Sequence, residues 1–194
     1  MVSPCRPFAA LQPVIRKLAA GEALFAVGDA AHGFFEVRSG RLKLVRFGAD
    51  GRETLLFMAG SGERFAEASL FTETYHCDAI AVSDCTIARF PKAAALAMLR
   101  TDMDARLDLT ADLAREVMRL RAALTLRDIR SARERVLAYL VAQAGADGRT
   151  VAIDGLLKDV AAAIGLTPEV FYRTLAQLEA ERVIRRGGGT IELT

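Results

Sequence analysis

The sequence has few residues that could bind a metal or form covalent cross-links. Its 194 residues include three cysteines, two histidines and no tryptophan. Cys5, Cys77 and Cys85 are too few and too scattered for a disulfide framework, which favours a reducing compartment. Metal-dependent enzymes on a jelly roll need two or more histidines and a carboxylate that converge, and His32 and His76 are the only candidates here. We therefore expect no enzyme and no resident cofactor.

Long apolar runs and a strong net charge are absent as well. No run reaches the roughly 18 apolar residues that span a bilayer, and the first eight residues lack the basic-then-apolar pattern of a signal peptide. We therefore expect a cytoplasmic protein without a membrane partner. The formal net charge of +2 does not by itself indicate a nucleic-acid binder. The length suffices for one large domain, or for two small domains with a connector.

Between about residues 13 and 91, short apolar segments alternate with glycines. Glycine and Asp-Gly supply the positive φ of tight turns, and segments spaced by 8 to 12 residues are typical of an antiparallel roll or barrel. The expected strands cover residues 23–25, 33–37, 42–47, 54–58, 80–82 and 86–90. This part of the chain is therefore predicted to form a β-roll.

From about residue 93 the apolar residues recur with a helical period. The stripe, with spacings of 4-4-3-4, consists of Leu109, Leu113, Val117, Leu120 and Leu124. Such spacing predicts a long helix with a near-heptad apolar face. The stripe could pack on the chain's own roll or on a second copy of the chain. Because a small roll offers little cover for so long a stripe, we favour a homodimer interface.

A third pattern begins near Asp128, which we expect to cap a helix. One face of that helix would carry Val136, Leu137, Leu140 and Val141. A short strand is expected at residues 150–153. The final segments, 183–186 and 190–193, flank three glycines and predict a hairpin.

Between that strand and the hairpin, the sequence predicts two helices joined by a sharp turn. The first covers residues 157–164, and Gly165 makes the turn. Thr167 suits the N-cap of the second helix, and Pro168 suits its first position, where no N–H is needed. Small alanines beside the glycine allow close packing, as in a helix-turn-helix with a wing.

The second helix of this pair has two distinct faces. Phe171, Leu175 and Leu178 are spaced to form its buried face. The opposite face then presents Glu169, Tyr172, Arg173 and Gln177. This second face is the candidate recognition surface, together with Pro168 at the start of the helix.

Glu169 and Arg173 lie four residues apart on this face, and two interpretations are open. They could form a plain surface ion pair worth a few tenths of a kcal/mol. In a recognition helix, arginine could instead bond guanine O6 and N7, and glutamate could accept from cytosine. The surrounding helix-turn-helix pattern favours base contact. Arg185, Arg186 and Lys158 are candidates for phosphate contacts, or they are solvated surface residues.

In its order of elements the chain resembles the family of cyclic-AMP receptor proteins and fumarate-nitrate regulators (CRP/FNR). The segments that carry the resemblance are Gly21-Glu22, Phe25, Gly28-Asp29, Ser39-Gly40-Arg41-Leu42 and Gly62 through Phe71. The resemblance implies an α+β fold with a β-roll sensor domain (residues 1–92), a long dimerisation helix (93–127) and a winged-helix DNA-binding domain (128–194). It also implies a homodimer on palindromic promoter sites in double-stranded DNA, with RNA polymerase as a partner of an activator.

The sequence departs from the cyclic-nucleotide binders of that family at the effector pocket. Those proteins carry Gly-Glu-Leu and then an Arg-Ser pair, whereas this chain has Ala66-Glu67-Ala68 and Cys77-Asp78. A buried phosphate would meet a thiol and a carboxylate, which is strongly disfavoured. Family members bond the adenine from a Thr-Ser pair, which corresponds to Val117-Met118 here. We therefore expect an effector other than cyclic AMP, or none.

Three dispersed cysteines cannot hold the iron–sulfur cluster of the fumarate-nitrate type. His76 and Cys77 are each possible haem or metal ligands, but adjacent strand residues point to opposite faces. The simplest interpretation is a buried apolar Cys77 and a surface His76. A haem-, metal- or thiol-based sensor of the same fold remains an alternative, as does a ligand sensor whose winged helix contacts protein.

Overall fold

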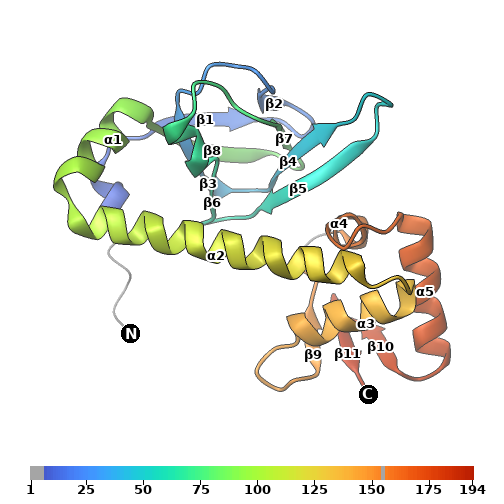
Figure 1. Cartoon of the computed structure of the whole chain (residues 1–194). Helices are drawn as coiled ribbons and strands as arrows, with labels where there is room; N and C mark the ends of the chain where they lie inside the picture. The colour runs from blue at the N-terminus through green and yellow to red at the C-terminus, as the bar shows by residue number, and fades with distance from the viewer. Residues whose placement is uncertain (1–6, 154–155) are drawn as a thin grey trace. The chain divides into compact units, whose positions relative to one another are not determined.

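The computed structural model describes residues 7–153 and 156–194, and Cys5 lies outside this part of the chain. The chain divides into two compact units, the first ending at Glu116 and the second beginning at Val117. The fold is α+β, as expected (Figure 1). Within the described residues, no helix combines the length and apolar character needed to cross a membrane.

The first unit contains two four-stranded antiparallel sheets that share one core. The first sheet has, in spatial order, β1 (Val14–Leu18), β8 (Cys85–Pro91), β3 (Gly33–Ser39) and β6 (Arg64–Phe65). The second has β2 (Ala23–Phe25), β7 (Asp78–Ala81), β4 (Leu42–Phe47) and β5 (Glu53–Ala59). The six predicted strands are all present, and β1 and β6 are additional.

Strand β3 is buried on both faces, because its first five residues are all buried and successive side chains point to opposite faces. Phe35 and Val37 belong to the core between the two sheets. Phe34 lies in a second core, where its ring stacks on Phe90 at a centroid distance of 4.8 Å and contacts Phe8 edge-on. This second core packs beneath the helices of the first unit, so the roll is covered on that side.

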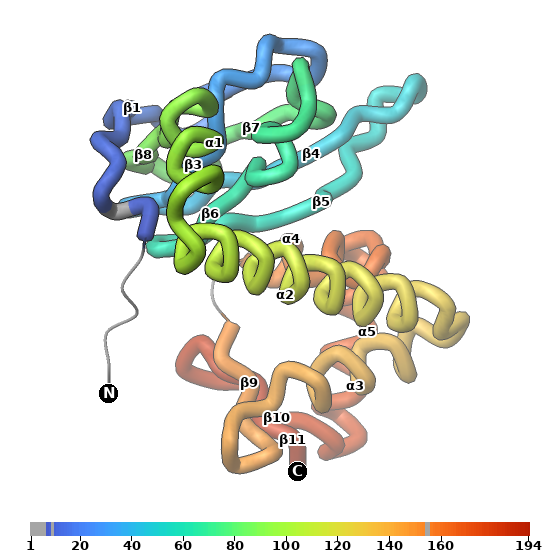
Figure 2. Tube along the Cα trace, turned by 60° about the vertical axis from the view of Figure 1, so that its left-hand side comes forward, coloured from blue at the N-terminus to red at the C-terminus, as the bar shows by residue number. Residues whose placement is uncertain are grey.

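The predicted long helix is broken into two. Helix α1 (Lys92–Thr101) lies against β3 and β8 (Figure 2), and α2 (Met103–Asp128) follows after one residue. The residue at the break, Asp102, caps α2 because its Oδ1 accepts a hydrogen bond from the Ala105 amide at 3.0 Å. Two short 3₁₀ helices, η1 (Pro7–Ala10) and η2 (Glu67–Phe71), complete the first unit.

Helix α2 is tied to the roll by Arg64 of β6. Its Nη1 lies 2.7 Å from Oδ2 of Asp108, and its Nη2 pairs with Asp112. The Arg64 guanidinium also lies over the ring of Phe8, 5.5 Å from the centroid. The first half of α2 is therefore fixed to the first unit by ion pairs and by apolar packing.

The second unit has the predicted winged-helix order. Its elements are α3 (Ala132–Gln143), β9 (Thr150–Ala152), α4 (Leu157–Ala163), α5 (Pro168–Ala180), β10 (Ile184–Gly187) and β11 (Thr190–Leu193). The strands form one antiparallel sheet in the order β10-β11-β9. The expected cap at Asp128 is wrong, because Asp128 is the last residue of α2. Ser131 caps α3 instead, accepting a hydrogen bond from the Glu134 amide at 3.3 Å.

The core of the second unit joins α3 and α5 to the small sheet. Its fully buried side chains include Val136, Leu140, Phe171, Leu175 and Leu178. Leu137 is half-buried, but Val141 is 63% exposed. The apolar face predicted for α3 is therefore narrower than expected.

Candidate functional site

The second helix of the helix-turn-helix, α5, begins where the sequence places it. Thr167 is its N-cap, with Oγ1 accepting a hydrogen bond from the Val170 amide at 3.4 Å, and Pro168 is its first residue. Phe171, Leu175 and Leu178 are fully buried, as predicted. Burial of these three residues fixes which face of α5 is left to solvent.

The turn before α5 is braced by a residue that the sequence analysis missed. Gly165 has a φ of 69°, in the left-handed region that favours glycine. Nη1 of Arg135 donates to the carbonyls of Ile164 and Gly165, both at 3.2 Å. The same guanidinium donates from Nε to the Ile129 carbonyl at 2.9 Å. Arg135 therefore satisfies the carbonyls at the end of α4 and holds the turn against α3.

The exposed face of α5 presents all the side chains proposed for recognition. They are Pro168, Glu169, Tyr172, Arg173 and Gln177. Within residues 7–153 and 156–194, the guanidinium of Arg173 has no hydrogen bond or ion pair, including with Glu169. The Glu169 carboxylate accepts hydrogen bonds from its own amide and from Thr167, which lower the pKa of that carboxyl. The surface ion pair between Glu169 and Arg173 is absent, so Arg173 is available to a partner.

Gln177 differs from Arg173 because it is already engaged. Its Nε2 donates to Oε1 of Glu181 at 3.0 Å, and Glu181 also pairs with Arg133 of α3 at 2.8 Å. These exposed bonds lower the pKa of the Glu181 carboxyl. One N–H of the Gln177 amide is therefore used within the chain, and the amide has a second N–H and a carbonyl oxygen for contacts with another molecule.

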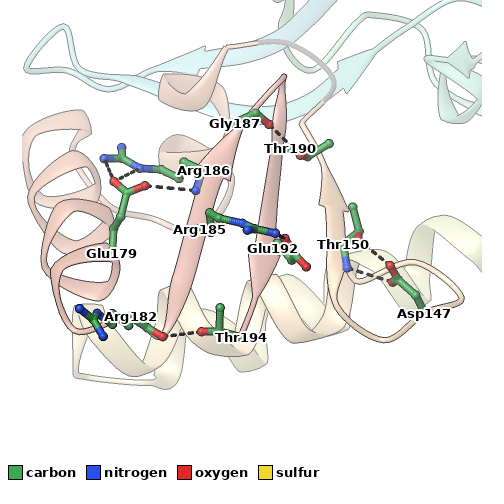
Figure 3. A network of polar contacts seen from close by, with 10 residues as sticks. All are labelled: Asp147, Thr150, Glu179, Arg182, Arg185, Arg186, Gly187, Thr190, Glu192 and Thr194. Carbon is green, nitrogen blue, oxygen red and sulfur yellow. Dashed lines mark hydrogen bonds and ion pairs between the residues drawn. The ribbon is translucent and has the colours of Figure 1, made fainter.

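Both arginines of the wing carry a glutamate partner (Figure 3). Arg186 pairs with Glu179 of α5, which accepts from the Arg186 amide at 3.1 Å and from its Nε at 2.9 Å. Arg185 donates from Nε to Glu192 at 3.1 Å, across the β10–β11 hairpin. The bonds from Arg186 also lower the pKa of Glu179. Glu179 therefore links the wing to α5, a connection that the sequence analysis missed.

The predicted dimer stripe divides into a buried part and an exposed part. Leu109 is only 5% exposed and Leu113 is half-buried, both within the second core of the first unit. Including Leu109 in a dimer interface was therefore wrong, because it packs on the chain's own roll. Val117, Leu120 and Leu124 are 45%, 45% and 61% exposed. These three form an apolar surface that the chain itself leaves open, here called the α2 stripe.

Near the proposed effector position, Ala66 adopts an unusual backbone conformation. Its φ of 61° and ψ of 27° are left-handed, although it is not glycine. It directly precedes Glu67, the first residue of η2, and packs against the core between the sheets. Ala68 is exposed. The segment thus holds a left-handed backbone bend without a glycine.

The Glu67 carboxyl has a raised pKa. Its burial is the main cause, and the neighbouring Glu116 adds repulsion, while the backbone amide of Glu67 and Arg64 oppose the shift. A carboxyl whose pKa is higher in the folded state opposes folding once it ionises. The negative charge of Glu67 is therefore unfavourable for the stability of the fold at neutral pH.

We expect Glu67→Gln to raise the melting temperature at neutral pH. The gain should vanish below the ordinary pKa of 4.5, where Glu67 is protonated in both the folded and the unfolded states. Thermal unfolding followed by circular dichroism, at neutral pH and below pH 4.5, measures the change in melting temperature. Glu73→Gln, at an exposed position, is the control. A gain that persists at low pH, or no gain at neutral pH, would contradict the assignment.

Cys77 and Asp78 are both occupied in holding the roll together. Cys77 is 2% exposed in the core between the sheets, and burial raises the pKa of its thiol to about 11. Oδ1 of Asp78 accepts a hydrogen bond from the Val27 amide at 3.1 Å. His76 is exposed, so the two adjacent residues face opposite ways. At neutral pH Cys77 is therefore mostly a neutral thiol and packs as a small apolar core residue.

The other proposed effector residues, Val117 and Met118, belong to the second unit and are 45% and 69% exposed. Neither side chain can donate a hydrogen bond to a base. In the part of the chain that the structure describes, no three His, Cys, Asp or Glu side chains are grouped to hold a metal ion.

Two protein families match the two parts of the chain. Residues 15–102 match the family described as "Cyclic nucleotide-binding domain", and residues 134–194 match the "Crp-like helix-turn-helix domain". These matches cover the roll with α1 and the winged helix, respectively.

Whole-chain relatives agree with this division. The chain is 32% identical to the "Cyclic AMP receptor protein" of Thermus thermophilus over 174 residues, which are 89% of this chain and 80% of that protein. It is 28% identical to the nitrogen fixation regulation protein FixK of Azorhizobium caulinodans, over 83% of this chain and 67% of that protein. FixK2 from Bradyrhizobium japonicum has the same fold, with a TM-score of 0.77, 21% identity and coverage of 94% and 93%. These relatives are regulators rather than enzymes, and the chain belongs to the CRP/FNR family of DNA-binding transcription regulators.

Proposed function

We propose that this regulator binds an inverted-repeat operator as a homodimer, with α5 of each protomer in the major groove. The observation that carries the proposal is the exposed Arg173 guanidinium, which has no partner among the described residues. It projects from a helix whose other face is fully buried, so the scaffold that presents it is rigid. A guanidinium held in this way can bond guanine O6 and N7 together.

Glu169 supports the same interpretation. It lies in the first turn of α5, one turn before Arg173, and its low pKa keeps it ionised as an acceptor. A carboxylate there can accept from the cytosine amino group. Tyr172, which is 42% exposed, and Pro168 flank these two side chains on the same surface.

The wing and α4 would position the protein without reading sequence. Arg185 and Arg186 lie on β10, and Lys158 is exposed on α4. Phosphate contacts of this kind fix the register of a protein on the duplex. Within a two-fold dimer, the half-sites would lie about one helical turn apart, roughly 34 Å.

The proposed effector is not cyclic AMP, or there is none. The Arg-Ser pair that holds the cyclic phosphate in family members is replaced by Cys77 and Asp78. Cys77 is a buried neutral thiol, and the Asp78 carboxylate accepts a hydrogen bond from the Val27 amide. Neither residue offers a cation to a phosphate, which supports the loss of nucleotide binding.

We expect Arg173→Ala to weaken operator binding by about 1–3 kcal/mol per half-site and to relax the preference for guanine at one position. Fluorescence anisotropy with the operator and with single-base variants measures both effects. Arg133→Ala, which removes an exposed arginine paired with Glu181, is the matched control. Equal weakening on all sequences would make Arg173 a phosphate contact. Unchanged binding would indicate that the winged helix has another partner.

A further inference from the structure

The first unit contains a hollow that is separate from the proposed effector position. Its volume is about 490 Å³, within the range of sites for small molecules. It lies at the end of the roll where β1 and β2 meet the loop before β3. It is lined by Val14, Ile15, Arg16, Leu24, Phe25, Asp29, Ala30, His32, Phe35, Tyr75, Ile87 and Arg89. None of Glu67, Ala68, Cys77 and Asp78 is part of its wall.

Arg89 of β8 contributes an unsatisfied cation to this wall. Its Cα is paired with Val14 on one side and with Phe35 on the other. Its Nε is buried and, among the residues that the structure describes, has no hydrogen-bond partner. A buried donor without a partner costs free energy, and an unpaired charge costs more. Arg89 therefore brings to the hollow a donor that the described residues leave unsatisfied.

The second arginine in the wall, Arg16, is engaged within the chain. Its Nη2 lies 3.2 Å from Oε1 of Glu22, and its Nη1 donates to the Leu24 carbonyl at 3.3 Å. These contacts hold Arg16 at the edge of β1. Arg89 is thus the arginine of this wall that is available to an anion.

Three aromatic side chains, Phe25, Phe35 and Tyr75, also line the hollow, and each is largely buried. The rings of Phe25 and Tyr75 stack at a centroid distance of 3.8 Å, and Phe25 stacks on Phe35 at 5.4 Å. The Tyr75 hydroxyl donates to the Gly33 carbonyl and accepts from the His32 amide, both at 3.1 Å. The tyrosine is therefore fixed, and its hydroxyl is used within the chain. Because these rings stack on one another, an aromatic ligand would meet them mainly at their edges, an arrangement that aromatic pairs favour.

The charged residues in the wall of the hollow favour a ligand with a single negative charge. Asp29 also lines the hollow, where its Oδ2 accepts from the Ala26 amide at 2.8 Å. A carboxylate near the site repels a dianion more strongly than a monoanion. A single available guanidinium matches one carboxylate, which it can bond with two N–H groups.

We propose that this hollow binds a small aromatic carboxylic acid, with the carboxylate on Arg89 and the ring against Phe25 and Tyr75. The ligand supplies the acceptors that the Arg89 guanidinium lacks and covers the apolar rim formed by Val14 and Ile15, which are 49% and 54% exposed. This site is independent of how the protein contacts DNA.

Calorimetric titration of the full chain with benzoate and phenylacetate tests the proposal, with benzamide as a neutral ligand of similar shape. We expect saturable binding of an acid at millimolar concentration or below, and none of benzamide. Arg89→Gln should weaken acid binding about tenfold or more, the effect of losing one charge-assisted contact. Lys17→Gln removes an equal charge from β1 outside the hollow and should leave binding unchanged.

Ala30→Phe gives a second test that does not touch Arg89. Ala30 is exposed at the rim, so a ring there should block the hollow without disturbing the core. Circular dichroism establishes whether each variant folds. If Arg89→Gln does not fold, the effect of Ala30→Phe on acid binding tests the site by itself. The proposal fails if neither acid binds at millimolar concentration, if benzamide binds as well as benzoate, or if Lys17→Gln loses as much affinity as Arg89→Gln.

Discussion

Leu120→Asp is expected to convert the dimer into monomers and, in consequence, to abolish operator binding at concentrations that saturate the wild type. Leu120 lies in the middle of the α2 stripe and is 45% exposed within its own chain. Two-fold symmetry would place two aspartates in one apolar seam, which costs several kcal/mol of association free energy because neither charge has a partner. Sedimentation velocity at micromolar concentration gives the oligomeric state directly.

Ala122→Asp is the matched control for this variant. It adds the same charge to the same helix, but its position is exposed and two residues away, on the opposite face of α2. We expect it to remain dimeric. A wild type that sediments as a monomer at micromolar concentration, or a Leu120→Asp variant that stays dimeric, would refute the α2 stripe as the interface.

Cyclic AMP is expected to bind at least about a thousandfold more weakly than at a micromolar site, and to leave DNA affinity unchanged. A lost charge-assisted contact to the phosphate costs about 1.5–3 kcal/mol, and the loss of the base contact adds to it. Each 1.4 kcal/mol is a tenfold change. The buried thiol of Cys77 and the carboxylate of Asp78 supply no compensating cation.

Calorimetric titration with cyclic AMP and cyclic GMP is the direct measurement. The double variant Cys77→Arg with Asp78→Ser should recover some affinity if the left-handed bend at Ala66 still presents the backbone to a phosphate. Because Cys77 is buried, the folding of this variant has to be verified by its thermal transition. A micromolar dissociation constant for the wild type would overturn the expectation.

The fold could be predicted from the sequence wherever one periodicity dominates. The short apolar runs of β3 and β8 and the buried face of α5 are of this kind, because each is a pattern typical of its element. Strand β1 was missed because four of its five residues are exposed, so that it shows no alternation. The break at Asp102 was missed because its evidence is a single capping hydrogen bond.

The candidate site was predictable only in part, for a related reason. The exposed face of α5 follows from the helical period once Phe171 and its partners are known to be buried. The ion pair between Glu179 and Arg186 joins residues of different elements, and no local spacing indicates it. The same holds for Arg89, whose place in a hollow depends on three strands that meet only in the folded roll.

Apolar residues that share one face of α2 differ in their surroundings, as Leu109 shows. Its spacing from Val117 and Leu120 fits a single stripe, yet it packs beneath the roll while they remain exposed. The heptad spacing reports which side chains share a face of α2. Which surface each part of that face contacts depends on where the roll ends, and the heptad repeat does not encode this.

The glutamate partners of the wing arginines have a consequence for the ionic-strength dependence of DNA binding. A free arginine that neutralises a phosphate releases a condensed cation from the duplex, and this release makes affinity fall with added salt. Arg185 and Arg186 already carry carboxylate counterions in Glu192 and Glu179. When such an arginine turns to a phosphate, its glutamate is left exposed and attracts a cation from solution. If the wing contacts DNA as proposed, we therefore expect its net ion release to be smaller than its two arginines would suggest, and its contribution to affinity to be less sensitive to salt.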